Sequence, residues 1–118
     1  MRRLLVLSLV LGLGIAGAKA HAFLDHASPA VGSSLSQPPQ QVRLWFTTAL
    51  EPAFSKVTVL DAGGKQVDAG DVKVDSKEPS LLTVSLPKLL PGLYKVHWRV
   101  VSIDTHVTEG DFAFRLAP

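Results

Sequence analysis

The segment Asp104-Thr105-His106 carries the side chains with the clearest chemical potential in this 118-residue chain. A carboxylate and an imidazole can both bind metal ions. If the segment is extended, residues two apart point to the same side, so Asp104 and His106 would face one site while Thr105 points away. A β-turn would break this geometry. The simpler interpretation is then a local turn bond for Asp104 and a surface position for His106.

His21 strengthens the metal interpretation because of the segment before it. That segment has the three parts of a cleavable Sec signal: positive charge at Arg2 and Arg3, an apolar run over residues 4–15, and the small-residue site Ala18-Lys19-Ala20. The run is too short to cross about 30 Å of hydrocarbon. We therefore expect a signal peptide at residues 1–20, export to the periplasm without a membrane anchor, and a mature domain at residues 21–118 that starts with a free α-amine on His21.

A free α-amine turns His21 into a chelating residue. An α-amino group has an ordinary pKa of about 7.7–8.0, so it loses its proton to a metal at modest cost. With the imidazoles of His21 and His106 and the carboxylate of Asp104, the set holds three nitrogens and one oxygen, which suits the square-planar or tetragonal preference of Cu(II). Zn(II) could use the same ligand types, but it prefers a tetrahedron and ranks below Cu(II) in affinity for nitrogen ligands. Residues 21–118 contain no Cys and no Met, so we predict one Cu(II) per chain and no tight Cu(I) site.

The composition excludes several other classes of protein. The full chain has 12 Lys and Arg against 10 Asp and Glu, but Arg2, Arg3 and Lys19 lie in the predicted signal, so nine basic residues face ten acidic ones in the mature domain. No basic run or basic patch with aromatics is present, which argues against nucleic-acid binding. The mature length fits one domain. Without Cys that domain has no disulfides, and its stability must come from an apolar core.

Two-residue alternation predicts the elements that position these ligands. Apolar residues alternate with polar ones in four runs, whose expected core-facing residues are Val42, Leu44 and Phe46; Val57 and Val59; Leu82, Val84 and Leu86; and Tyr94, Val96, Trp98 and Val100. Pro- and Gly-containing turns separate the runs. The pattern favours an all-β fold of about seven strands, an immunoglobulin-like β-sandwich or Greek-key barrel. The segment 90–96 is typical of a tyrosine corner, with the Tyr94 hydroxyl bonded to upstream backbone.

The residues also resemble a known family over nearly the whole mature chain. The stretches that carry the resemblance are His21-Ala22-Phe23-Leu24, Ser28-Pro29-Ala30, Val42-Arg43-Leu44-Trp45-Phe46, residues 94–106 with Val101-Ser102-Ile103-Asp104-Thr105-His106 at their end, and Gly110-Asp111-Phe112-Ala113-Phe114. They are similar to the CopC family of periplasmic copper-resistance proteins. The resemblance implies an immunoglobulin-like Greek-key β-sandwich that binds Cu(II) through His21, Asp104 and His106. It also implies a membrane copper transporter as a partner.

The chain departs from that family at two places. Some members bind Cu(I) at a methionine-rich loop, for which this chain has no methionine. Some carry a Glu after the Leu-x-Phe strand as an extra Cu(II) contact, where this chain has Thr48, and Glu51 three residues later is a weak substitute. These departures leave one Cu(II) site as the expectation.

Other residues and functions carry less weight. His26 lies an odd number of residues from His21 and would face away from it in an extended segment, although it could be an auxiliary ligand. His97 shares a strand face with Lys95 and Arg99, which favours a solvated position. We expect a monomeric, non-enzymatic Cu(II)-binding protein for copper resistance and homeostasis, by storage or delivery. The alternatives are a metal-free structural or adhesive module and, least favoured, a copper-dependent oxidative enzyme.

Overall fold

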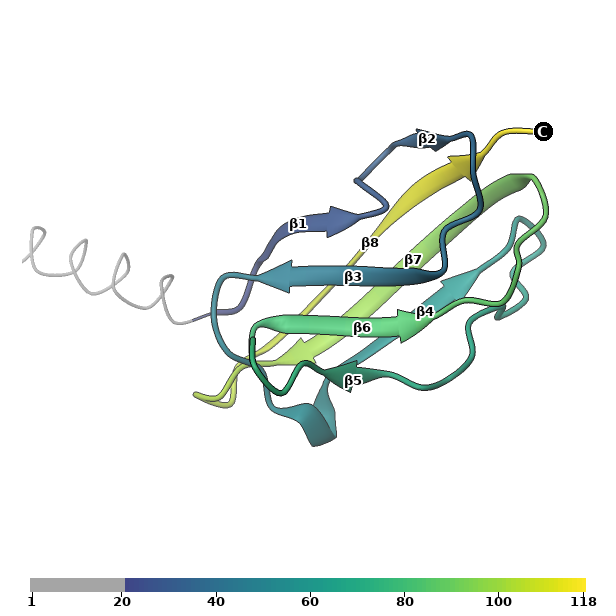
Figure 1. Ribbon diagram of the computed structural model, residues 1–118. Coiled ribbons are helices and arrows are strands. Elements are labelled where there is room, and N and C mark those ends of the chain that lie inside the picture. The colour runs from purple at the N-terminus through teal and green to yellow at the C-terminus, as the bar shows by residue number, and fades with distance from the viewer. Residues whose placement is uncertain (1–20) are drawn as a thin grey trace, which may run out of the picture.

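The computed structural model describes residues 21–118, which form two four-stranded β-sheets packed face to face (Figure 1). The predicted signal peptide at residues 1–20 lies outside the described residues. The elements in chain order are β1 (Leu24–Ser28), β2 (Ser34–Leu35), β3 (Gln41–Phe46), the 3-10 turn η1 (Pro52–Phe54), β4 (Lys56–Leu60), β5 (Lys73–Val74), β6 (Leu81–Ser85), β7 (Gly92–Val101) and β8 (Val107–Leu116). Within residues 21–118, no helix has the length and apolar character needed to cross a membrane.

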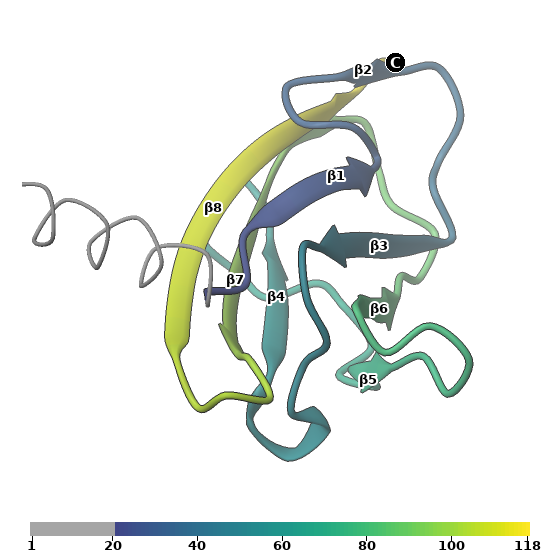
Figure 2. The same ribbon diagram turned by 90° about the vertical axis from the view of Figure 1, so that its left-hand side faces the viewer.

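The strand order defines the sandwich. One sheet runs β1-β3-β6-β5 and the other runs β2-β8-β7-β4 (Figure 2). Neighbouring strands are antiparallel except for β2 and β8, which are parallel. This arrangement confirms the expected immunoglobulin-like Greek-key β-sandwich. The barrel-like variant is wrong for residues 21–118, because the two sheets stay separate.

The described part of the chain has eight strands, where the sequence indicated about seven. The short strands β2 and β5 explain why the number of strands is hard to predict from the sequence. Each has two residues, and two residues cannot display an alternating pattern, so their pairing is decided by the neighbouring strand and not by their own sequence.

The core lies between the two sheets and contains the side chains that the alternation predicted. On β3 and β7 every second residue is buried and points inward. The buried apolar side chains from both sheets include Val42, Leu44, Phe46, Val57, Val59, Leu82, Val84, Leu86, Tyr94, Val96, Trp98, Val100, Phe112 and Phe114. A fully buried side chain of this kind contributes about 1.5–3 kcal/mol to folding. These contacts stabilise a chain that has no disulfide.

β6 differs from the expected half-buried strand. Four of its five residues are buried, including Thr83, which the alternation placed toward solvent. Thr83 lies across from Arg43 on β3 and from Lys73 on β5. Long basic side chains on both sides can cover a short residue between them with their apolar stems.

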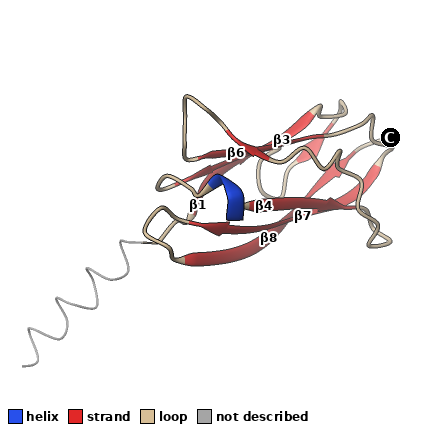
Figure 3. Cartoon of the chain, turned by 90° about the horizontal axis from the view of Figure 1, so that it is seen from below, coloured by secondary structure: helices blue, strands red, loops and turns tan. Residues whose placement is uncertain are grey.

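The β7–β8 hairpin carries the loop that matters for function. The Tyr94 hydroxyl donates a hydrogen bond to the Leu90 carbonyl in the loop before β7, which confirms the predicted tyrosine corner. At the other end of the hairpin, backbone hydrogen bonds tie the loop to the segment that leads into η1. η1 is the blue turn in Figure 3. Ile103 N donates to Ala49 O at 3.2 Å and Glu51 N donates to Val101 O at 2.8 Å. The loop is therefore attached to the sandwich by backbone hydrogen bonds.

Gly110 of β8 provides a test of core packing. A Cβ atom at this position would lie 2.5 Å from Cζ2 and 2.9 Å from Cε2 of Trp98. Trp98 cannot move away freely, because it is 8% exposed and packs edge-on against Phe46 with ring centroids 5.1 Å apart. We expect Gly110→Ala to lower the free energy of unfolding by about 1–3 kcal/mol, the usual cost of overpacking, as measured by urea denaturation.

Gly63 is the matched control for this experiment. A Cβ atom at Gly63 would meet only Asp61 Oδ1 at 3.4 Å, an ordinary contact distance. We expect Gly63→Ala to change the free energy of unfolding by less than about 0.5 kcal/mol. Equal unfolding midpoints for the two variants would show that the Trp98 ring has room to shift.

Candidate metal centre

The loop between β7 and β8 is a closed turn and not an extended segment. Thr105 N donates to Ser102 O at 2.8 Å, and Ser102 N donates to His106 O at 2.9 Å. Thr105 has φ of 71°, in the left-handed region that β-branched residues rarely adopt. The segment Asp104-Thr105-His106 is therefore not extended, and the expectation that a turn would break the shared geometry is wrong. A turn does not separate Asp104 from His106, because the left-handed Thr105 brings the chain back and places both side chains on one side.

Asp104 and His106 are in direct contact at the tip of this loop. Nδ1 of His106 lies 3.2 Å from Oδ2 of Asp104, and both side chains are about half exposed. The Ser102 hydroxyl donates a hydrogen bond to the other carboxylate oxygen, Oδ1. This bond, with a smaller contribution from His106, lowers the pKa of the Asp104 carboxyl from its ordinary value. The carboxylate therefore stays ionised at neutral pH and can act as an anionic oxygen ligand.

The N-terminal segment reaches the same place because both sheets hold it. Ala22 is fully buried, and its carbonyl accepts a hydrogen bond of 2.6 Å from the Thr108 hydroxyl on β8. From the other sheet, Thr47 Oγ1 accepts a bond of 2.9 Å from Phe23 N and makes a longer contact of 3.4 Å with the His21 carbonyl. These hydrogen bonds hold the backbone of residues 21–23 against the sandwich.

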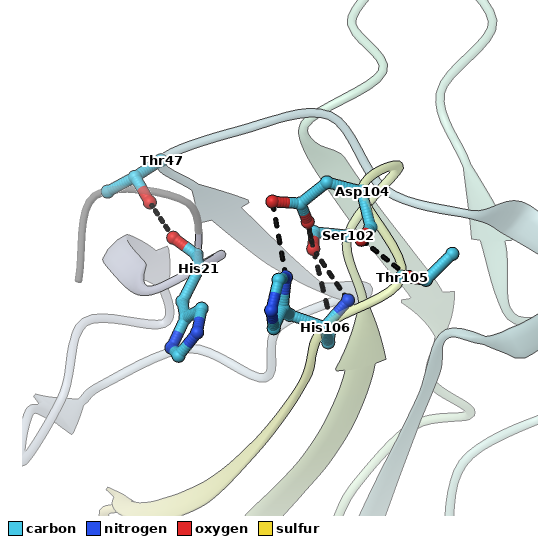
Figure 4. A network of polar contacts seen from close by, with 6 residues as sticks. All are labelled: His21, Thr47, Ser102, Asp104, Thr105 and His106. Atoms are coloured by element: carbon cyan, nitrogen blue, oxygen red, sulfur yellow. Dashed lines mark hydrogen bonds and ion pairs between the residues drawn. The ribbon is translucent and has the colours of Figure 1, made fainter. Parts of the chain in front are cut away.

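His21 and His106 come from opposite ends of the described chain and lie side by side (Figure 4). Their ring centroids are 4.5 Å apart, with an angle of 36° between the ring planes. Among residues 21–118, no three His, Cys, Asp or Glu side chains already converge on one point as a metal-binding group. The three predicted ligands instead form two adjoining contacts, His21 with His106 and His106 with Asp104. We call these three residues the histidine cluster.

The donors of the histidine cluster fit an ion of borderline softness. They are two imidazoles and one carboxylate, and residues 21–118 supply no sulfur ligand. Imidazole suits Zn, Cu, Fe and Ni, while thiolate and thioether select Cu(I). Two ligand atoms bound at right angles, each about 2.0–2.1 Å from an ion, lie about 3 Å apart. The contact between His106 and Asp104 is close to that separation.

The other two histidines lie elsewhere. His97 is on the outer face of its sheet, where Nε2 lies 3.8 Å from Glu109 and Nδ1 lies 4.0 Å from Asp111. His26 stacks on Trp45 with ring centroids 4.4 Å apart and contacts the carboxylate of Asp25 at 2.7 Å. Both side chains therefore have partners outside the histidine cluster.

Sequence reasoning missed the hydroxyl groups that hold the histidine cluster. Ser102 had a local signal, since a Ser two residues before an Asp can bond to it across a turn. Thr47 and Thr108 had none, because their partners are far away in the chain. These three side chains link the strands of the sandwich to the loop and to the N-terminal segment.

The fold and these contacts define the class of protein: an immunoglobulin-like β-sandwich that carries imidazole and carboxylate side chains at one end. The family model described as the CopC domain matches residues 24–117. The chain therefore belongs to the CopC family.

Relatives and solved structures agree with this membership. The chain is 31% identical over 115 residues to copper resistance protein C of Xanthomonas campestris pv. juglandis, covering 92% of this chain and 90% of that protein. It is 32% identical over 98 residues to copper transport protein CutJ of Bacillus subtilis (strain 168), covering 82% of this chain but only 18% of CutJ. The crystal structure of CopC from Methylosinus trichosporium OB3b has a TM-score of 0.78 and 38% identity, covering 83% of this chain and 95% of that chain.

Proposed function

We propose that this protein binds one Cu(II) ion at the histidine cluster and sequesters or delivers copper in the periplasm, in the service of copper resistance and homeostasis. The observation that carries the proposal is that the ring centroids of His21 and His106 lie 4.5 Å apart in a member of the CopC family. The ligands would be the α-amine and imidazole of His21, the imidazole of His106 and a carboxylate oxygen of Asp104. In this role copper is cargo.

The exposure of the histidine cluster supports a carrier and not a buried permanent cofactor. The side chains of Asp104 and His106 are 40% and 50% exposed, so an acceptor can approach the ion directly. Relatives named for copper resistance and copper transport support the same role. A membrane copper transporter is the proposed acceptor, and the carrier would act as a monomer without catalysis.

Copper titration of the processed protein, residues 21–118, tests the proposal. We expect one Cu(II) per chain to survive gel filtration. Cu(II) at about a hundredfold excess over Kd should stabilise the fold by about 2.7 kcal/mol, which corresponds to a rise in Tm of about 10–20 °C for a domain of this size. A metal-free structural or adhesive module would show neither effect. Tighter binding of Zn(II) than of Cu(II) would contradict the choice of ion.

The absence of sulfur ligands gives a prediction about oxidation state. Residues 21–118 contain neither Cys nor Met, and Cu(I) favours thiolate and thioether over imidazole and carboxylate. We expect ascorbate to release copper from the loaded protein to a Cu(I) chelator of modest affinity. The measurement is the absorbance of the chelator complex, with the unreduced protein as the control. Retention of copper after reduction would show a tight Cu(I) site.

A further inference from the structure

Ser102 is a fully buried polar residue directly behind the histidine cluster. Its side chain has no exposed surface, and its backbone forms an isolated antiparallel bridge with Leu50 beyond the end of β7. A buried hydroxyl without a hydrogen bond costs folding free energy, so its position implies a defined set of partners. Those partners all belong to the loop that carries Asp104 and His106.

The hydrogen bonds of the Ser102 hydroxyl have one consistent arrangement. The oxygen lies 3.3 Å from His106 N, which can only donate, and 3.2 Å from His106 O. The hydroxyl has a single proton, and the ionised Asp104 carboxylate is a stronger acceptor than a backbone carbonyl. The proton therefore goes to Asp104 Oδ1, while the oxygen accepts from His106 N.

This arrangement fixes the direction of the Asp104 carboxylate. With Oδ1 held by a buried donor, Oδ2 faces His106 Nδ1 at 3.2 Å. The Asp104 side chain is itself 40% exposed, so without this bond it would lose a restraint on its rotation. Holding a ligand in its bound direction before the ion arrives saves the ordering cost at binding.

We propose that Ser102 is a positioning residue for copper, acting through Asp104: its hydroxyl holds one carboxylate oxygen so that the other is aimed at the ion. This inference rests on the proposed function. Groups that orient metal ligands typically change metal affinity by about 10–100-fold when removed. For a single bond to a half-exposed carboxylate we expect the lower end, so Ser102→Ala should weaken Cu(II) binding about tenfold.

A double-mutant cycle tests the route of the effect. Cu(II) affinity is measured by chelator competition at neutral pH for the processed protein, Ser102→Ala, Asp104→Ala and the double variant. We expect the tenfold loss from Ser102→Ala to shrink to less than about twofold when Asp104 is already alanine, since contacting residues in one network are not additive. Equal losses of affinity in the processed protein and in Asp104→Ala would mean that Ser102 only supports the loop. If Ser102→Ala causes no loss in the processed protein, Ser102 has no role in copper binding.

The Cu(II) electron paramagnetic resonance spectrum supplies a readout that a loss of stability would not change. We expect the spectrum of Ser102→Ala to resemble that of Asp104→Ala, because both variants alter the same oxygen ligand. An unchanged spectrum would contradict the proposal. If the processed protein itself binds no Cu(II), the proposed function fails; if it binds and Ser102→Ala is neutral, only the positioning role fails.

Two controls separate the hydroxyl from the packing around it. Ser55 is also buried. Its Oγ accepts a hydrogen bond of 3.2 Å from the backbone N of Val101, the residue just before Ser102, and makes no hydrogen bond to the histidine cluster. Ser55→Ala should leave Cu(II) affinity within about twofold. If Ser102→Ala does not fold, Ser102→Thr and Ser102→Val form a second pair, equal in shape and different only in the hydroxyl. The Val variant should bind about tenfold more weakly than the Thr variant, and equal affinities would overturn the proposal.

Discussion

Replacement of His106 by alanine should weaken Cu(II) binding by at least about a hundredfold. The variant loses a ligand and not merely a group that orients one, so its effect should meet or exceed the upper end of the range for orienting groups. The variant also removes the imidazole ring whose centroid lies 4.5 Å from that of the His21 ring. Asp104→Ala should cost less, because one carboxylate oxygen is a weaker donor to Cu(II) than an imidazole nitrogen. Competitive titration at neutral pH measures both losses.

The remaining histidines are the controls for this prediction. His97→Ala removes an imidazole of similar exposure whose neighbours are Glu109 and Asp111 on the outer face of a sheet. His26→Ala removes one that stacks on Trp45. Both variants should bind Cu(II) within about twofold of the parent protein. A loss for His97→Ala comparable to that for His106→Ala would show that the copper site has been assigned to the wrong strand.

A single glycine added before His21 should weaken Cu(II) binding by at least about tenfold, or roughly 1.4 kcal/mol. In a free terminus the α-amine can lose a proton and donate its lone pair. In an amide the lone pair is delocalised into the carbonyl and cannot serve as a neutral donor. The backbone of the N-terminal segment should stay in place, because Thr108 and Thr47 hold it at Ala22 and Phe23. The loss therefore measures the amine itself.

The opposite end of the chain provides a matched extension. The C-terminus lies at the end of the sandwich away from the β7–β8 loop (Figures 1 and 2), so a glycine added after Pro118 should leave Cu(II) affinity unchanged. Equal affinities for the N-terminally extended and processed proteins would mean that the α-amine is not a ligand. The ligand set would then reduce to side chains alone.

The sequence by itself determined which residues face the core. A β-strand turns each successive side chain to the opposite face, so alternation along 94–100 is enough to place Tyr94 and Trp98 inside, whatever the neighbouring strands. The tyrosine corner was also readable, because the Tyr94 hydroxyl bonds to a residue only four positions away. The side-chain types of Asp104 and His106, together with the predicted cleavage before His21, identified the residues of the histidine cluster as the chemically interesting ones.

The sequence could not determine how the loop brings Asp104 and His106 together. A shared side for the two residues was expected only if the segment were extended, and their contact instead depends on a turn whose Thr105 has a left-handed backbone. That conformation is unfavourable for an isolated threonine. It persists because hydrogen bonds from Ser102 and the segment before η1 hold the loop. A local sequence pattern predicts the backbone conformation that is favoured locally, so it could not predict the left-handed conformation of Thr105.

Only the tertiary structure decided that His21 meets His106. The approach requires β3 to bring Thr47 and β8 to bring Thr108 to the two sides of the N-terminal segment. Each of these bonds joins residues that are distant in the chain, so no spacing in the sequence encodes it. The free energy that orders the segment comes from packing two sheets around Ala22, and packing between distant strands exists only once the whole sandwich has formed.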